Sequence, residues 1–291
     1  MTSKLIKICG PIQILLAGLT YTLGAGIAHY LGYPINYMVF VLGMLASITL
    51  QASAYLFSEF FRLPLAPVEP DETPRQREKF RVTLLQVSYA AFTLSFAIIL
   101  SLLFAHSINL YAGTLFVLII LFLMAYAIPP LRLAAAGYGE LVLAVFLGTF
   151  LPALSFLLQS GTFHRLLSFT TFPLTLLALA YLLTWDFPTF ATDHKLARPT
   201  LLTRLTWQRA IPIHNILILL AFLIFSSAPL LNIPWVMIWP VFLVLPFAAV
   251  QVYWLQRIST GGRTLWNFLT ALSVATFGLS AYLLTMTFWI R

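Results

Sequence analysis

Apolar runs recur along the whole chain and are separated by short segments of turn residues and charges. Each run has about twenty residues, enough to cross the roughly 30 Å hydrocarbon core of a bilayer as an α-helix. The breaks include Gly32-Tyr33-Pro34, Pro129-Pro130 and Gly261-Gly262, which are typical helix-ending sequences. The pattern predicts transmembrane helices near residues 9–30, 35–61, 82–105, 109–128, 139–158, 167–185, 211–231, 234–256 and 264–290.

The composition agrees with a membrane location. Hydrophobic residues make up 61% of the chain and charged residues only 8%, against about 25% charged residues in soluble domains. A membrane β-barrel would show short segments of alternating polarity, and the sequence has none. We therefore expect an all-α integral membrane protein of nine transmembrane helices, with residues 1–291 as a single polytopic domain. The single cysteine, Cys9, excludes an internal disulfide and any multi-cysteine metal site.

The basic residues lie almost entirely on one side of the predicted membrane. With the N-terminus inside, every Lys and Arg except Arg165 and Arg291 falls in an inner loop or at an inner helix end. Cytoplasmic loops concentrate positive residues, so we expect a multi-pass protein of the cell membrane with a cytoplasmic N-terminus and an outer C-terminus. Basic residues beside phospholipid head groups account for the net charge of +8, and no nucleic-acid partner is expected.

The acidic residues are segregated in the same way, although Asp and Glu contribute little to topology. All eight lie at inner helix ends or in inner loops. They are Glu59, Glu69, Asp71, Glu72, Glu78, Glu140, Asp186 and Asp193. The two longest inner loops, 62–81 and 186–210, follow the second and sixth helices, and we expect them to form a cytoplasmic cap. Any polar site is therefore expected on the cytoplasmic side.

Two carboxylates of the second inner loop have a spacing that fits a metal site. Asp186, Thr189 and Asp193 would share one face of a continuous helix, since seven residues make close to two turns. Two carboxylates on one face could hold Mg²⁺, which prefers oxygen ligands and keeps several waters. Pro188 favours a different arrangement, in which a new helix begins at Asp186. Asp186 would then be an N-cap and Asp193 a surface charge.

Glu59 and Arg132 also have alternative interpretations. Glu59 lies at the end of the second predicted helix and Arg62 follows three residues later, so the two can form a local ion pair. Arg132 is the only basic residue of the loop after Pro129-Pro130. Its guanidinium group could bind a phosphate in a bidentate way, or act only as an orientation charge. The segment Gly24-Ala25-Gly26 is interpreted as a small-residue contact between helices.

Two longer stretches carry a family resemblance. The chain reads YAIPPLRLAAAGYGELVLAVFLG from Tyr126 to Gly148, and DFPTFATDHKLARPTLLTRL from Asp186 to Leu205. These stretches resemble the UbiA superfamily of membrane prenyltransferases, in particular the menaquinone-pathway branch that prenylates dihydroxynaphthoate. The resemblance covers nearly the whole chain and implies a nine-helix UbiA-type bundle with polar motifs after helices two and six.

Three positions depart from the family pattern. The family carries Asn-Asp-x-x-Asp at the end of helix two, where this chain has Ser58-Glu59-Phe60-Phe61-Arg62. Thr189 occupies a position where the family usually has aspartate. Downstream, Asp71-Glu72-Thr73-Pro74-Arg75 resembles the family's aspartate followed by arginine, at a shifted spacing. The aspartate motifs are therefore degenerate relative to the family.

The resemblance implies transfer of a prenyl group from a prenyl diphosphate to an aromatic, quinone-precursor-like acceptor, with Mg²⁺ bridging carboxylates and diphosphate. It implies catalytic and metal-binding roles for Glu59, Asp186 and Asp193. The diphosphate-binding residues that it implies are Arg62, Arg75, Tyr126, Arg132 and Arg198.

Arg62 leaves two functions open. The arginine could replace a metal by contacting the diphosphate directly, or it could repel Mg²⁺ and abolish turnover. In the second case the protein would be a non-catalytic subunit that binds lipid, quinone or pigment within a larger membrane complex. A transporter is disfavoured because the spans lack ionisable residues for ion coupling.

Overall fold

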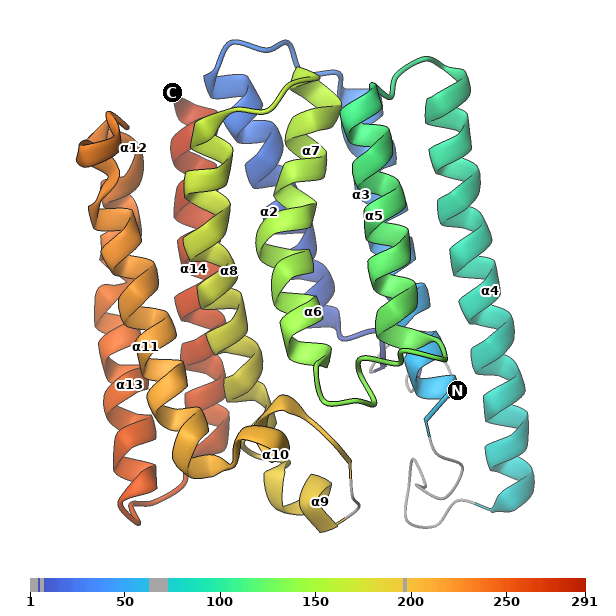
Figure 1. Ribbon diagram of the computed structural model, residues 1–291, viewed down its shortest axis with the longest axis vertical. Coiled ribbons are helices and arrows are strands. Elements are labelled where there is room, and N and C mark those ends of the chain that lie inside the picture. Colours follow the sequence, from blue (N-terminus) through green and yellow to red (C-terminus); the bar gives the residue numbers. More distant parts are fainter. Residues whose placement is uncertain (1–4, 6–7, 63–72, 196–197) are drawn as a thin grey trace.

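Long helices stand side by side in the computed structural model, which describes residues 5, 8–62, 73–195 and 198–291 (Figure 1). Every regular element within these residues is helical. The α-helices are α2 (Pro11–Tyr30), α3 (Tyr37–Phe60), α4 (Pro74–Phe104), α5 (Leu110–Ala127), α6 (Gly139–Val145), α7 (Leu151–Ser160), α8 (Arg165–Asp186), α9 (Phe190–Lys195), α10 (Leu201–Leu205), α11 (Trp207–Ser226), α12 (Trp235–Ile238), α13 (Leu245–Ser259) and α14 (Trp266–Ile290). A π-helix, η1 (Phe146–Phe150), and two 3-10 helices, η2 (Ala228–Leu231) and η3 (Trp239–Val244), complete the set.

Nine helical stretches of the described chain are long and apolar enough to cross a membrane, which confirms the predicted all-α bundle. Two of these stretches are interrupted. The fifth span joins α6, η1 and α7, and the eighth joins α12, η3 and α13. A proline stands in the first turn after each interruption, Pro152 in α7 and Pro246 in α13. Proline has no N–H to donate, so it is tolerated where a helix restarts.

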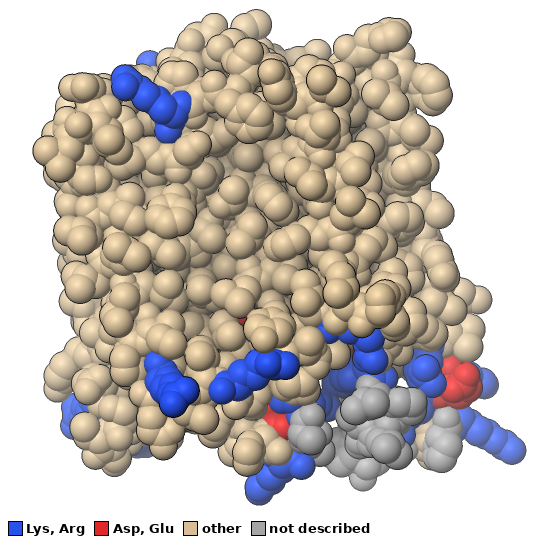
Figure 2. Space-filling view, viewed as in Figure 1, with Lys and Arg blue, Asp and Glu red and all other residues tan. Residues whose placement is uncertain are grey.

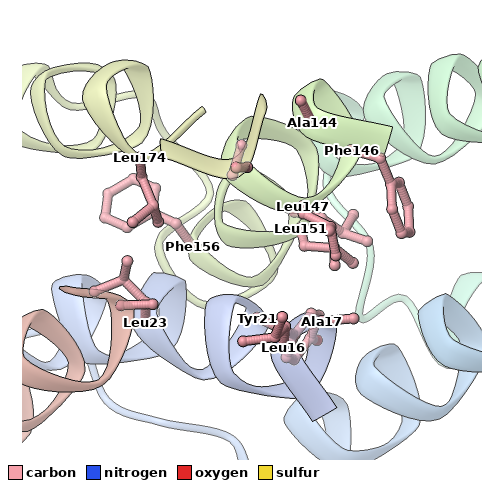
Figure 3. Close-up of a cluster of buried hydrophobic side chains, with 14 of the residues drawn as sticks. Leu16, Ala17, Tyr21, Leu23, Ala144, Phe146, Leu147, Leu151, Phe156 and Leu174 are labelled. Atoms are coloured by element: carbon pink, nitrogen blue, oxygen red, sulfur yellow. The ribbon is translucent and has the colours of Figure 1, made fainter. Parts of the chain in front are cut away.

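The spans form a central group and a periphery. In the most apolar window of Gly139–Ser160, 78% of the residues are buried, against 17% in that of Arg75–Phe104. The fifth span and α8 therefore lie inside the bundle, whereas most of α4 faces the surroundings. Figure 3 shows Leu16 and Tyr21 of α2 facing Leu147 and Leu151 of the fifth span across the core. These apolar contacts surround the buried helices and fix their positions.

Two glycines allow helices to approach closely. A Cβ atom at Gly24 would overlap the carbonyl group of Pro152, so α2 and α7 meet backbone to backbone. A Cβ atom at Gly148 would overlap the backbone of Thr175 in α8. Small residues are typical of such contacts in membrane bundles, where close packing rather than the hydrophobic effect drives helix association. The predicted small-residue contact at Gly24 is therefore confirmed.

Some predicted helix boundaries were wrong. Helix α4 begins at Pro74 rather than at residue 82, because Thr73 and Gln76 form a capping box that starts the helix earlier. Helix α11 begins at Trp207 rather than at 211 and continues through Pro212. It ends at Ser226, and the 3-10 turn η2 occupies the remainder of the predicted span. The loop expected at 62–81 is thus partly helical, and its residues 63–72 lie outside the described part.

Charged side chains gather at one end of the bundle, where α3 and α8 end and α6 begins. We call it the charged end. Figure 2 shows Lys, Arg, Asp and Glu side chains clustered there, while the broad middle of the same face carries no Lys or Arg. The short helices α9 and α10 lie across this end (Figure 1). The ring of Trp207 packs against Phe187 and Trp266, with centroids 4.8 and 5.8 Å away, and this apolar cluster attaches the segment after α8 to the bundle.

Candidate active-site cavity at the charged end

A cavity of about 460 Å³ opens at the charged end, between the ends of α2, α3, α5, α6 and α8. Its walls combine aromatic rings with two carboxyl groups. The rings belong to Tyr55, Tyr126 and Trp185, and the carboxyl groups to Glu140 and Asp186. The volume lies within the range of about 300–1,000 Å³ that is usual for small-molecule sites. An apolar pocket with a few convergent polar groups is suited to a ligand with a charged end and a hydrophobic body.

The Asp186 and Glu140 carboxyl groups lie next to each other in the lining of this cavity. Asp186 is the last residue of α8, and Glu140 lies in the first turn of α6. The two carboxyl groups are within hydrogen-bonding range of each other. Asp186 Oδ2 is buried, and no hydrogen-bond partner for it is found among the described residues. Since ionised carboxylates only accept hydrogen bonds, this pair requires a proton or a cation between its members.

Glu140 has a second partner in the cap, by which we mean the short helices α9 and α10 that lie across the charged end. Its Oε2 accepts a hydrogen bond of 3.2 Å from the backbone N–H of Leu201, the first residue of α10. The neighbouring Arg204 guanidinium stacks on the Tyr138 ring at 4.5 Å and donates to its hydroxyl at 3.1 Å. These contacts attach α10 to the start of α6 across about sixty residues of chain, a separation at which only the folded structure brings the groups together. Glu140 therefore links the cavity to the cap.

The other two acidic candidates are paired with arginines. Glu59 Oε1 lies 2.6 Å from an Arg62 nitrogen, which is the local ion pair that the sequence allowed. Asp193 Oδ1 lies 3.9 Å from Arg198 Nη1, and the Arg198 charge also acts on Glu59. Arg198 Nε is buried without a hydrogen-bond partner among the described residues. The four acidic residues of this region thus form two pairs. Glu59 and Asp193 are each paired with an arginine, whereas Glu140 and Asp186 line the cavity.

The predicted common helix face of Asp186, Thr189 and Asp193 was wrong. Helix α8 ends at Asp186 and α9 begins only at Phe190. Asp186 is not an N-cap either: its backbone carbonyl accepts bonds from the Thr189 N–H at 3.2 Å and the Thr189 hydroxyl at 3.1 Å. Pro188 within this turn cannot continue the helix, which explains the break. Asp193 is 8% exposed rather than a surface charge, and its carboxylate acts electrostatically on Asp186 despite the break.

Tyr126 is one of the aromatic residues that line the cavity. Its ring meets Tyr55 edge-on at 6.1 Å between centroids, and its hydroxyl group interacts with the Ser58 side chain. The charges of Glu140 and Asp186 also act on Tyr126. Ser58 is one of the positions where the sequence departs from the family pattern, and the contact places it beside the aromatic wall. Tyr126 is the member of the predicted diphosphate-binding set that lines the cavity itself.

Arg132 and Arg75 lie outside the cavity lining. The Arg132 guanidinium donates to the backbone carbonyl of Phe61, immediately after the end of α3. The bond joins the loop after α5 to the end of α3 and engages one of the five guanidinium donors. Arg75 is exposed in the first turn of α4. Asp71 and Glu72, which precede it in the resemblance, lie outside the described residues.

Glu140 is the site residue that the sequence-based prediction did not assign. The Gly-x-Gly-Glu signature at 137–140 was visible in the sequence, but nothing in it indicates that the carboxyl group faces Asp186. The only available signal was that Glu140, like every acidic residue, lies at an inner helix end. A carboxylate at the start of a helix is also favoured by the helix dipole, which offers a purely structural reason for a glutamate there.

The donor set suits Mg²⁺ that arrives with a diphosphate. Among the described residues, no three His, Cys, Asp or Glu side chains lie close enough to hold a metal ion by themselves. Mg²⁺ commonly binds one or two protein carboxylates and takes its remaining ligands from waters and substrate phosphates. The Asp186–Glu140 pair, with its unpartnered buried oxygen, fits that mode. Glu59 fits it less well because Arg62 already occupies its carboxylate.

Comparisons with known proteins identify the fold. No family model and no curated protein sequence matches the chain. Several solved structures match over nearly the full length. A UbiA homologue from Archaeoglobus fulgidus bound to GPP and Mg²⁺ has a TM-score of 0.63 and 13% identity, covering 99% of this chain and 98% of its own.

Two further solved structures agree. A UbiA homologue from Aeropyrum pernix K1 in its apo form has a TM-score of 0.61 and 15% identity, covering 92% of this chain and 96% of its own. The digeranylgeranylglyceryl phosphate synthase has a TM-score of 0.56 and 14% identity, covering 99% and 98%. Identities this low carry information about the fold rather than the reaction. The chain therefore has the nine-helix fold of the UbiA homologues.

Proposed function

We propose that this protein is a membrane prenyltransferase, which transfers a prenyl group from a prenyl diphosphate to an aromatic acceptor. The observation that carries the proposal is the buried, unpartnered Asp186 Oδ2 beside Glu140, in a cavity walled by aromatic rings. The fold adds support, since a structure of the same fold was solved with GPP and Mg²⁺. A quinone-precursor-like acceptor is proposed on the sequence resemblance alone.

In this proposal the diphosphate lies at the charged end and the prenyl chain lies among the apolar helices. Mg²⁺ held by Asp186 and Glu140 would neutralise the diphosphate oxygens as the allylic C–O bond breaks. Arg198, whose buried Nε has no partner among the described residues, would donate to the same anion. Arg62, Arg75 and Arg132 remain proposed contributors to the positive field of this end.

The aromatic wall has a separate role. Departure of the diphosphate with its electron pair leaves an allylic cation, and the faces of Tyr55, Tyr126 and Trp185 can stabilise positive charge. A ring carbon of the acceptor then bonds to the prenyl carbon, and the same ring carbon releases its proton to the departed pyrophosphate. Enclosing the cation in an apolar cavity also limits its capture by water.

The direct test is Mg²⁺-dependent release of pyrophosphate from geranylgeranyl diphosphate by the full-length protein in nanodiscs, with dihydroxynaphthoate as acceptor. The key variant is Glu140→Gln, and the matched control is Glu78→Gln, because Glu78 is 71% exposed on α4. We expect release by the wild type and by Glu78→Gln, and a loss in Glu140→Gln. No release by the wild type across tail lengths and acceptors would refute the proposal.

A non-catalytic role is the second candidate, and the two arginine pairs favour it. Arg62 neutralises Glu59, and Arg198 neutralises Asp193, at positions where the family resemblance expects carboxylates for metal binding. A protein with this arrangement could retain the bundle as a lipid-, quinone- or pigment-binding subunit of a membrane complex. Stable co-purification with other membrane subunits, together with no pyrophosphate release, would favour this role.

We also propose that the charged end faces the cytoplasm and that the protein resides in the cell membrane. The support is the gathering of basic side chains at that end, next to α9 and α10 (Figure 2). Juxtamembrane basic residues are attracted to the anionic inner leaflet. A prenyl diphosphate made in the cytoplasm would then reach the cavity without crossing the bilayer.

A further inference from the structure

Thr206 has a strained backbone at the junction of the cap and the membrane span α11. Its φ and ψ angles are 65° and 158°, a combination that is essentially restricted to glycine. The branched Cβ of threonine makes a positive φ still less favourable. Helix α10 ends at Leu205 and α11 begins at Trp207, so Thr206 alone sets the angle between these helices. Strain of this kind persists only where surrounding contacts hold the backbone in place.

Contacts with the loop before α6 hold α10 in this position. The Arg204 guanidinium stacks on the Tyr138 ring and donates to its hydroxyl. Gly137 of the same loop has a φ of 76°, and a Cβ atom there would lie 2.8 Å from Arg204 Nε and 3.2 Å from the Thr200 carbonyl oxygen. Thr200 is the N-cap of α10, and Arg204 lies in its last turn. Both ends of this short helix therefore rest against one loop (Figure 1).

The position of α10 also affects the cavity, through Glu140. The Leu201 N–H donates to Glu140 Oε2, and Glu140 lines the cavity beside Asp186. Movement of α10 away from α6 breaks this bond and frees the oxygen for a ligand in the cavity. A buried apolar contact opposes that movement, because Leu202 is fully buried in a cluster that includes Phe187. The place of α10 thus decides how much of the Glu140 carboxylate is available.

We propose that α10 is a hinged lid beside the cavity, with Thr206 as its hinge and the contacts to Tyr138 and Glu140 as its clasp. The lid is closed in this structure. Opening lets Thr206 return to an ordinary backbone conformation, so the strain lowers the free energy of opening. The clasp and the burial of Leu202 outweigh the strain, which makes the open lid a minor state in a local equilibrium. The lid is a property of the fold and requires no turnover in the cavity.

The test is hydrogen exchange at the backbone amides of α10, measured by mass spectrometry on the full-length protein in nanodiscs. Thr206→Gly removes the strain, because glycine adopts a positive φ without a Cβ clash. Thr206→Ala is the matched control, since it removes the exposed hydroxyl but keeps the Cβ atom. Arg204→Leu breaks the clasp on the lid side. Arg209→Leu makes the same chemical change at an exposed arginine of α11.

We expect exchange at α10 to be at least about threefold slower in Thr206→Gly than in Thr206→Ala, because only glycine relieves the closed lid. Exchange in Arg204→Leu should be about fivefold faster than in the wild type, since the ring contact and its hydrogen bond are both lost. Arg209→Leu should match the wild type. Adding Thr206→Gly to Arg204→Leu should bring the exchange rate back toward the wild-type value.

Equal exchange in Thr206→Gly and Thr206→Ala would show that the hinge stores no strain and would overturn the proposal. Unchanged exchange in a folded Arg204→Leu variant would overturn it as well. The amides of α8 report on the whole bundle, so faster exchange there identifies a variant that has lost more than the lid. If Arg204→Leu behaves in that way, the two Thr206 variants still decide the question, because Thr206 is exposed and neither change touches the core.

Discussion

The Arg62 guanidinium lies 2.6 Å from the Glu59 carboxylate, one helical turn away at the end of α3. Both side chains are partly buried, at 27% and 19% exposure. A carboxylate in such a pair is already neutralised, so it attracts a divalent cation less than an unpaired carboxylate does. Glu59 and Asp186 therefore differ in their environment although both lie at the charged end. Glu59 is paired with an arginine, and Asp186 Oδ2 has no partner among the described residues.

Glu59 and Asp186 should therefore respond differently to loss of charge. We expect Asp186→Asn to lower Mg²⁺-dependent pyrophosphate release by at least about 100-fold, equivalent to about 2.7 kcal/mol. Glu59→Gln should lower it by less than about tenfold, or 1.4 kcal/mol. Initial rates across a Mg²⁺ titration give both values. Equal losses in the two variants would show that Glu59 also binds the metal, as the sequence resemblance implied.

Removing Mg²⁺ should itself stop the reaction, provided that Asp186 and Glu140 take their metal together with the diphosphate. We expect EDTA to abolish pyrophosphate release and excess Mg²⁺ to restore it. The metal should protect the protein against thermal unfolding only when a non-hydrolysable prenyl diphosphate analogue is present, because no preformed three-residue metal site is found among the described residues. Protection by Mg²⁺ alone would contradict this order of binding.

Glu140 should also control the attachment of the cap. Glu140→Leu removes the acceptor of the Leu201 N–H bond, whereas Glu140→Gln keeps an oxygen that can accept it. Loss of a hydrogen bond to a charged group costs about 1.5–3 kcal/mol. We expect faster trypsin cleavage after Arg204 in Glu140→Leu, with Glu140→Gln close to the wild type. Hydrogen exchange at α10 provides an independent measurement, and unchanged exchange in Glu140→Leu would argue against this link.

Two glycine substitutions in the same helix should change stability in opposite directions. Gly24→Ala places a Cβ against the Pro152 carbonyl, and overpacking of this kind costs about 1–3 kcal/mol. Gly18 of α2 has no atom within 4 Å of the equivalent position, so Gly18→Ala should gain the usual 0.5–1 kcal/mol or so of a helical alanine. SDS titration of the purified protein measures both values. A stabilising Gly24→Ala would show that α2 and α7 separate easily.

The proposed orientation can be checked with single cysteines in a Cys9→Ser background. Arg165 at the start of α8 and Arg263 before α14 are both exposed, and they lie at opposite ends of the bundle. We expect an impermeant maleimide to label Arg165→Cys on intact cells and Arg263→Cys only after lysis. The reverse pattern would place the charged end outside.

The features that depend on local sequence could be predicted, and those that depend on tertiary contact could not. The apolar runs predicted the spans because membrane crossing is a property of each segment alone. The Glu59–Arg62 pair was foreseen because three residues of helix bring the groups together. Asp186 and Glu140 lie on different helices, so their contact follows from how α6 and α8 pack. Sequence spacing alone offered only the Asp186–Asp193 face, which the turn at Pro188 abolishes.

The buried hydrogen bond between His214 of α11 and Gln251 of α13 shows the same limit. No residue at ligand spacing along the sequence points to His214, because its partner Gln251 is a neutral residue of another span. A search restricted to ionisable residues overlooks such networks. The capping box that starts α4 at Thr73 was missed for a different reason. The apolar run begins later than the helix, so hydropathy marks the membrane boundary rather than the helix boundary.

The π-helix at Phe146–Phe150 affects how related chains can be compared with this one. A π turn closes one residue later than an α turn, so the segment contains one residue more than a regular helix needs for the same rotation. A helical wheel drawn through the whole fifth span at about 100° per residue therefore misplaces Glu140 relative to α7 by about one position. A chain without the π turn would direct its glutamate into the same cavity with one residue fewer. A correct alignment of the two would place a single-residue gap inside a transmembrane helix.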